Sequence, residues 1–165
     1  MCRMLGVHFA ITAEQERLLV AAGDADDTES VADLLEDLEE NWADDDLIVE
    51  TDKAWDAIHR CLGDGSLDPD GGEYPLSYAI LGGRHLHDDY YVCYVTAAQV
   101  RDVAVALRQI DEAELRRRFD RMDDEDYDGT ADDEDFAYTW DNFVDVQRFY
   151  DRAAAAGRAV LFTAT

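Results

Sequence analysis

One helical stretch brings an indole and an imidazole to the same side of the chain. The helix predicted for residues 51–63 has four side chains at the spacing of one face: Trp55, Ile58, His59 and Leu62. Trp55 and His59 could line a ligand pocket, where the indole would stack on a ligand and the imidazole would act as acid or base. The alternative is a tightly packed helix whose ring N–H groups find backbone partners.

Three charged residues would complete such a pocket. Asp52 and Lys53 come just before the apolar face, so they would lie at the pocket mouth. Asp52 could then orient His59 for proton transfer. Arg84 follows a pair of glycines and could place a cation near a bound anion. These residues define a hypothetical small-ligand or active site.

A second candidate is an acidic stretch with the spacing of a calcium-binding EF-hand loop. Its carboxylates lie at Asp124, Asp126, Asp128, Asp132 and Asp135, with a glycine at 129. Three features oppose calcium binding: the last ligand is the short Asp135, the eighth position is Ala131, and Asp123 stands where the entering helix needs an apolar residue. The alternative is an acidic surface loop over residues 123–135.

Two imidazoles fall close together at His85 and His87, followed by two aspartates. On an extended segment both rings would face the same side, as a divalent-metal site requires. A closed site needs three or four ligands, and the sequence shows no further His/Cys cluster. A polar turn before the strand at Tyr91 is the alternative.

The first residues suggest a covalent chemistry. Removal of Met1 would expose Cys2 as an N-terminal nucleophile whose own amine serves as base. This opening is similar to that of class II glutamine amidotransferases over a handful of residues. The N-G-D and G-R-G-D segments that hold the substrate in those enzymes are absent, as are the phosphate-loop, dinucleotide, serine-hydrolase and zinc-protease motifs.

Hydrophobic periodicity predicts the elements that must position these groups. Alternating or continuous apolar runs predict strands at 5–11, 91–95 and 159–163, with a short extended piece at 47–49. Capping boxes at Thr12–Gln15 and Thr96–Gln99 predict helix starts. Further helical faces occur at 31–42, 51–63, 111–122 and 136–154. No regular βαβ alternation is sustained, so we predict an α+β fold: one domain, residues 1–165, with several helices on a small mixed sheet.

The two ends of the organising helix carry their own signals. Thr51 is placed to cap the first turn, where Asp52 would also meet the positive end of the helix dipole. Gly63 is placed to end the helix in a left-handed conformation. Leu76–Leu81 is expected to form one or two helical turns after a long loop rich in glycine and proline.

The charge of the chain is extreme. Forty acidic residues stand against 14 basic ones, a formal net charge of −26, and Lys53 is the only lysine. Such a field repels nucleic acid and anionic membranes, because binding to either needs clustered cations. It would attract a basic protein or a metal cation, although plain solubility is an alternative reason for it.

The compartment can be predicted from the cysteines and the start of the chain. Three cysteines, widely spaced and not in C-x-x-C pairs, indicate reduced thiols in the cytoplasm. The first residues lack the long apolar region and cleavage site of a signal peptide, and no window of ~18 apolar residues predicts a membrane span.

Several segments resemble the YfbM-like family, a bacterial domain family of unknown function. The similar segments are D-K-A-W-D-A-I-H-R-C-L-G at 52–63, P-L-S-Y-A-I-L-G-G at 75–83, Y-V-T-A-A-Q-V at 94–100, F-Y at 149–150 and A-A-A-A-G-R-A-V-L-F at 153–162. The resemblance implies a single cytoplasmic α+β domain, with a variable loop at 123–135. It implies no catalytic residues, since the family has no assigned activity, and it does not extend to Cys2, His85 or His87.

These observations favour a non-enzymatic binding module for a basic protein partner, as an immunity or antitoxin-type protein would be. The alternative is a small-ligand-binding protein or enzyme with a pocket around Trp55 and His59. A minor alternative is divalent-cation binding at Asp124–Asp135. No cofactor is predicted apart from that calcium ion.

Overall fold

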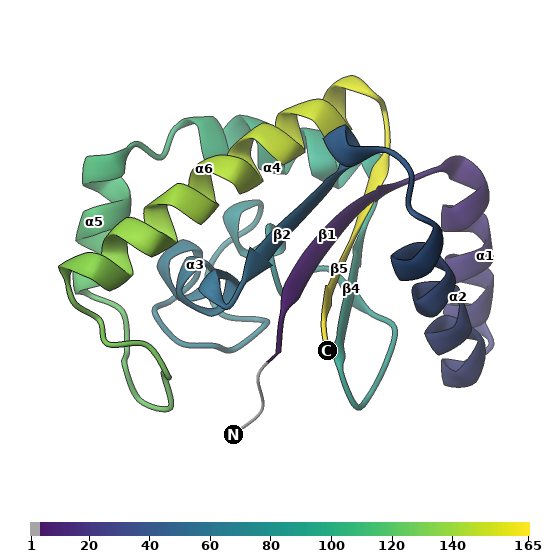
Figure 1. The fold of residues 1–165 in the computed structure, drawn as a ribbon, viewed down its shortest axis with the longest axis horizontal. Helices are drawn as coiled ribbons and strands as arrows, with labels where there is room; N and C mark the ends of the chain where they lie inside the picture. Colours follow the sequence, from purple (N-terminus) through teal and green to yellow (C-terminus); the bar gives the residue numbers. More distant parts are fainter. Residues whose placement is uncertain (1–3) are drawn as a thin grey trace.

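A five-stranded sheet runs through the middle of the molecule, with helices on both faces (Figure 1). The computed structural model describes residues 4–165. The strands are β1 (Gly6–Ile11), β2 (Ile48–Asp52), β3 (Arg84–His85), β4 (Tyr91–Val95) and β5 (Ala159–Ala164). The α-helices are α1 (Ala13–Asp24), α2 (Thr28–Asn41), α3 (Ala54–Leu62), α4 (Ala97–Arg108), α5 (Glu112–Asp120) and α6 (Asp133–Ala155). Two single 3₁₀ turns are η1 (Asp45–Leu47) and η2 (Leu76–Tyr78).

Every neighbouring pair of these strands is antiparallel, in the order β2-β1-β5-β4-β3. The α+β class is therefore confirmed, but the expectation of a mixed sheet is wrong for the described strands. The helical hairpin α1–α2 lies between β1 and β2. The chain reverses at each of the three joints from β1 to β2, so β2 runs back alongside β1 in the opposite direction.

The last strand forms the centre of the sheet and the boundary between two cores. All six residues of β5 are buried. Val160 and Phe162 face the core under α3, α4, α5 and α6. Ala159 and Leu161 face the smaller core under α1 and α2. A strand buried on both faces reads as a continuous apolar run, which is why the sequence predicted it inside the sheet.

Two helices begin as the sequence predicted, immediately after a strand. The Thr12 hydroxyl accepts from the Gln15 N–H, and the Gln15 side chain accepts from the Thr12 N–H. Thr96 and Gln99 repeat this capping box at the start of α4. The local pattern thus satisfies the first amide groups of each helix where β1 and β4 end.

The start of α3 differs from the prediction. Thr51 does not cap the helix, because β2 extends to Asp52 and pairs with β1. The Thr51 hydroxyl is buried and donates to the Gly6 carbonyl at 3.3 Å. A Cβ at Gly6 would lie 2.7 Å from both Thr51 Oγ1 and Trp55 Cδ1, so only glycine allows this close approach. The long-range strand contact therefore overrides the local capping signal.

The end of α3 is also different in detail. Gly63 follows the helix and its N–H donates to the His59 carbonyl at 2.9 Å. Its φ is −102°, so the expected left-handed conformation is wrong there. That conformation occurs two residues later, at Gly65, where φ is +94°.

None of the helices within residues 4–165 is both long and apolar enough to cross a bilayer.

Candidate functional site

Trp55 and His59 are both buried, at 5% and 1% exposure. The Trp55 Nε1–H donates to the Met4 carbonyl at 3.0 Å, and His59 Nε2 donates to the Asp68 carbonyl at 2.8 Å. Burial lowers the pKa of His59. The Trp55 ring also packs edge-on against Tyr91. Both polar ring groups are therefore satisfied by main-chain carbonyls, which favours a packing role for the two side chains.

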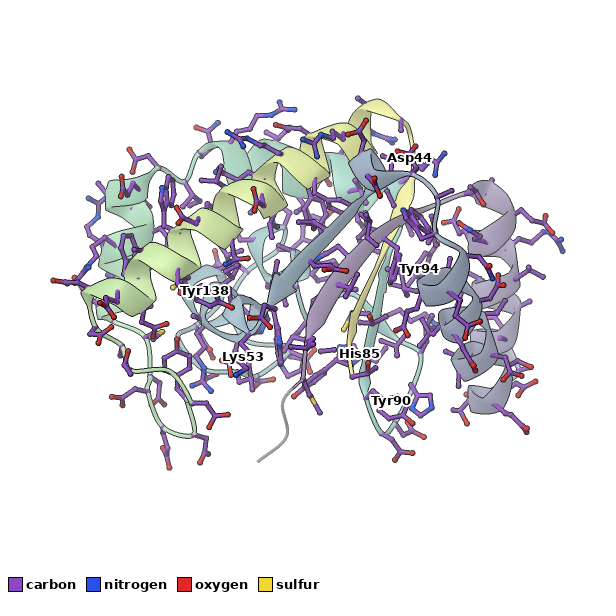
Figure 2. The ribbon with its side chains drawn as sticks, viewed as in Figure 1. Asp44, Lys53, His85, Tyr90, Tyr94 and Tyr138 are labelled. Carbon is purple, nitrogen blue, oxygen red and sulfur yellow. The ribbon has the colours of Figure 1, made fainter. Side chains whose placement is uncertain are left out.

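Asp52 and Lys53 are both exposed, and Lys53 lies beside Tyr138 of α6 (Figure 2). The Tyr138 hydroxyl donates to Asp52 Oδ2 at 2.9 Å and accepts from the Lys53 N–H at 3.2 Å. Arg84 instead pairs with Asp24 at the end of α1, 2.9 Å apart, on the other face of the sheet. The structure therefore does not gather the five predicted pocket residues around one cavity.

A buried arginine, which the sequence analysis did not single out, anchors the acidic loop. Arg60 is 2% exposed, and its Nε donates to Asp56 Oδ1 at 2.6 Å. Its Nη1 donates to the carbonyls of Asp123 and Glu125 at 2.7 and 3.0 Å. The guanidinium also lies over the Tyr127 ring, 5.4 Å from its centroid. The i, i+4 spacing of Asp56 and Arg60 was the only local signal for this cluster.

The carboxylates of the predicted calcium motif do not converge on one ion site. Two of them instead accept hydrogen bonds at the start of α6. Residues 123–132 form the loop, and α6 begins at 133. Asp132 Oδ1 accepts from the Asp135 N–H at 2.9 Å. Asp135 Oδ2 accepts from the Tyr127 hydroxyl at 2.6 Å and from the Ala131 N–H at 2.9 Å. The remaining motif carboxylates are exposed: Asp124, Asp126 and Asp128. Within residues 4–165, no three carboxylate, imidazole or thiol groups are placed to hold one metal ion.

His85 and His87 have separate surroundings. His85 Nε2 donates to the Leu81 carbonyl at 2.7 Å, whereas His87 stacks on Tyr90 at the hairpin tip, 4.4 Å between centroids (Figure 2). The β3–β4 register places Cys93 opposite His85, with Sγ 3.7 Å from Nε2. The sequence analysis missed this His85–Cys93 pair, which the pairing register of the β3–β4 hairpin would have indicated. Burial raises the pKa of Cys93, which favours the protonated thiol over the thiolate.

A buried histidine in β1 was also missed. His8 is fully buried, and its Nε2 donates to the Ala79 carbonyl at 2.8 Å, which also accepts from the Tyr150 hydroxyl at 2.7 Å. Its Nδ1 has no hydrogen-bond partner among residues 4–165. Burial lowers the pKa of His8 to about 4, so the ring is neutral at pH 7. Cys2, the candidate N-terminal nucleophile, lies outside the described residues.

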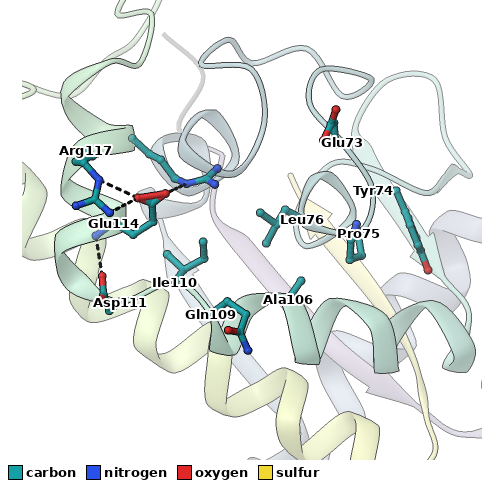
Figure 3. Close-up of a pocket in the computed structure, with 11 residues that line it drawn as sticks. Glu73, Tyr74, Pro75, Leu76, Ala106, Gln109, Ile110, Asp111, Glu114 and Arg117 are labelled. Atoms are coloured by element: carbon teal, nitrogen blue, oxygen red, sulfur yellow. Dashed lines mark hydrogen bonds and ion pairs between the residues drawn. The ribbon is translucent and has the colours of Figure 1, made fainter.

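One hollow of about 500 Å³ opens between η2 and the corner where α4 meets α5 (Figure 3). Leu76 and Ile110 line its apolar part. Its two arginines both pair with Glu114: Arg117 at 2.6 Å and Arg118 at 3.4 Å. The hydrogen bond from Arg117 lowers the pKa of Glu114. Three carboxylates, Glu73, Asp111 and Glu114, line this hollow against the two arginines, so it is a poor anion site.

A second hollow, of about 450 Å³, runs between α1 and α2. Its lining is mainly apolar, with Leu18 and Ala21 on α1, Ala25 just after α1, and Leu34 on α2. Carboxylates line its edge where α2 passes: Asp27 and Asp33. We call this hollow the α1–α2 groove. It combines exposed apolar surface with negative charge.

Comparison with known proteins places the chain in a family. The family model described as "Domain of unknown function (DUF1877)" matches residues 3–163. The chain belongs to the DUF1877 family. Its structure is similar to a crystal structure of YfbM from Escherichia coli, a protein of unknown function, with a TM-score of 0.73 and 22% sequence identity. The match covers 98% of this chain and 100% of that one. No curated protein matches the sequence.

The resemblance to YfbM-like proteins is thus confirmed, and so is the α+β fold. At 22% identity the structural likeness shows the fold alone. The DUF1877 family has no described activity, so the surface of this member must supply any functional argument.

The negative charge of this DUF1877 domain is unevenly distributed. Residues 13–41, which contain α1 and α2, carry eleven carboxylates against one arginine, a net charge of −10 out of the chain's −26. In contrast, α5 and the residue after it carry four arginines: Arg116, Arg117, Arg118 and Arg121. Figure 1 shows α5 at the far end of the molecule from α1 and α2. The face that holds the α1–α2 groove is therefore strongly negative.

Proposed function

We propose that this DUF1877 protein is a non-enzymatic binding module whose α1–α2 layer docks a basic protein partner. The observation that carries the proposal is the net charge of −10 carried by residues 13–41. Clustered charge of one sign steers a partner of the other sign and selects against like-charged surfaces. Immunity and antitoxin-type proteins bind in this way, and we propose a comparable role here.

The surroundings of the reactive side chains support binding rather than catalysis. Trp55 and His59 are held by main-chain carbonyls, and the Cys93 thiol is buried beside His85. The arginines of the hollow in Figure 3 are paired with Glu114. These groups have packing or surface roles, whereas exposed carboxylates of α2, such as Asp33, Glu36 and Glu40, are open to an incoming cation.

The test compares two variants that have the same net charge. In the first, four exposed carboxylates of α2 become amides: Asp33→Asn, Glu36→Gln, Asp37→Asn and Glu40→Gln. In the second variant, four carboxylates of the acidic loop become amides: Asp123→Asn, Asp124→Asn, Glu125→Gln and Asp126→Asn. Each replaces four of the 26 excess negative charges, giving −22. Each immobilised protein is exposed at low salt to lysate of its host, and the retained proteins are identified by mass spectrometry.

The wild type and the loop variant should retain the same basic protein, and the α2 variant should lose it. Raising the salt concentration should release the partner from the wild type, because exposed charges are screened within ~8–10 Å at physiological ionic strength. Retention of no basic protein, or equal loss from both variants, would contradict the proposal.

A further inference from the structure

We infer that the α1–α2 groove receives one basic amphipathic helix of the partner. This inference rests on the proposed function and adds to it a place on the surface and a shape for the bound segment. It depends on three properties of the groove: exposed apolar lining, a direction set by two helices, and a carboxylate edge.

The apolar lining of the groove is open to solvent. Leu18 is 39% exposed, and Ala21 and Ala25 are also exposed. These three residues follow one another at helical spacing, so they form a line that runs along α1 to its C-cap. Leu34 of α2 is half-buried across the groove. The small side chains between the two leucines leave room for the side chains of an incoming segment. They also let its backbone approach closely.

The groove has the geometry that fits a third helix. Only three residues, 25–27, join α1 to α2, so the two helices pack as a hairpin beside the sheet (Figure 1). Side chains of a third helix would fit between their ridges, as in helix-in-groove recognition. The 12 residues of α1 give a helix of about 18 Å, which would accommodate about three turns of a partner helix.

The charges around the groove decide which helix it takes. Asp27 and Asp33 line the groove, and Asp37 lies one turn beyond Leu34. Arg17 is the one cation of residues 13–41, and it already pairs with Glu14 at 2.6 Å. A helix with leucine-like residues on one face and Lys or Arg beside them would match both the apolar lining and the carboxylate edge. An acidic or uniformly polar helix would match neither.

The test uses a defined probe. A labelled amphipathic peptide of ~14 residues, built from leucine and lysine with the leucines on one helical face, is titrated with the full-length protein at low salt. Fluorescence anisotropy reports binding, and circular dichroism reports helix formation. We expect saturable binding, with helix formation on binding.

Single substitutions then locate the site. Leu18→Gln removes apolar surface, and Ala21→Gln fills the groove. Each should weaken peptide binding about tenfold, since loss of one partly buried leucine contact is worth about 1.4 kcal/mol. The matched control is Val105→Gln on α4, whose side chain is 55% exposed away from the groove, and it should leave binding unchanged. Both altered groove residues are exposed, so the variants should unfold at the same urea concentration as the wild type.

Two further comparisons separate the possible failures. A peptide of the same composition, with its leucines spread around the helix, should bind at least tenfold more weakly than the amphipathic one. Equal binding of both peptides, or equal weakening by Val105→Gln, would overturn the inference. If the four α2 amide substitutions abolish capture of the basic partner while Leu18→Gln has no effect on either ligand, the proposed function stands and the groove is wrong. If those amide substitutions leave partner capture intact, the proposed function itself fails.

Discussion

The guanidinium of Arg60 in α3 donates to the main-chain carbonyl of Asp123, 2.7 Å away. A buried cation thus holds an acidic loop through its backbone, while Asp124, Asp126 and Asp128 of the loop are exposed. The same guanidinium pairs with Asp56, whose own pKa is raised by burial and partly restored by Arg60. The cluster joins three segments: α3, the loop after α5, and the start of α6 through Tyr127.

Replacing Arg60 by methionine should therefore destabilise the fold strongly. The change leaves the half-buried Asp56 without its partner and removes the donor of two loop carbonyls, at a cost of about 3 kcal/mol. Urea unfolding followed by tryptophan fluorescence measures the loss. The control is Arg17→Met, which breaks an exposed pair with Glu14 and should cost less than about 1 kcal/mol. Equal effects of the two substitutions would show that the Arg60 cluster is not structural.

The two described cysteines should be unreactive in the native protein. Burial raises the pKa of Cys61 to about 12, and it raises that of Cys93 as well. Relative to a thiol of pKa 9.0, the thiolate fraction of Cys61 falls about thousandfold. In a Cys2→Ser variant, Ellman's reagent should label both thiols rapidly in denaturant and at least ~100-fold more slowly in buffer. Fast labelling of the folded protein would instead reveal a reactive cysteine and favour an enzymatic role.

The sequence predicted most of the fold because the signals that decide it are local. The capping boxes at Thr12 and Thr96 give two helix starts, and the apolar run at 159–163 gives the central strand. The failures occurred where a distant contact decides the conformation. Thr51 looks like a helix cap in its own segment, but pairing of β2 with Gly6 places it in a strand.

The candidate sites were predicted less well, for the same reason. Trp55 and His59 share a helical face as expected, but their partners are the carbonyls of Met4 and Asp68, which no local pattern indicates. Arg84 was grouped with them only by residue type, and the sheet separates it from them. The acidity of residues 13–41 was visible in the sequence. The α1–α2 groove was not, because it needs the packing of two helices.

His8 should make the stability of the protein depend on pH. Burial lowers its pKa from 6.5 in the unfolded chain to about 4 in the folded one. Between these values the unfolded state binds more protons, so stability rises with pH through this window and falls as the solution is acidified. The ring is enclosed by Phe149, Tyr150 and Phe162, which leaves no solvent for the imidazolium form.

Moving from about pH 7.5 to about pH 5 should cost the wild type about 2 kcal/mol of unfolding free energy through His8. The comparison is His8→Gln, whose amide can still donate to the Ala79 carbonyl but does not titrate. Burial also lowers the pKa of His59, but this residue is present in both proteins. Its contribution to the pH effect therefore cancels in the difference between them. Urea unfolding at the two pH values should therefore give a pH effect about 2 kcal/mol smaller in the variant. The same pH effect in both proteins would mean that the His8 ring takes up its proton within the folded core.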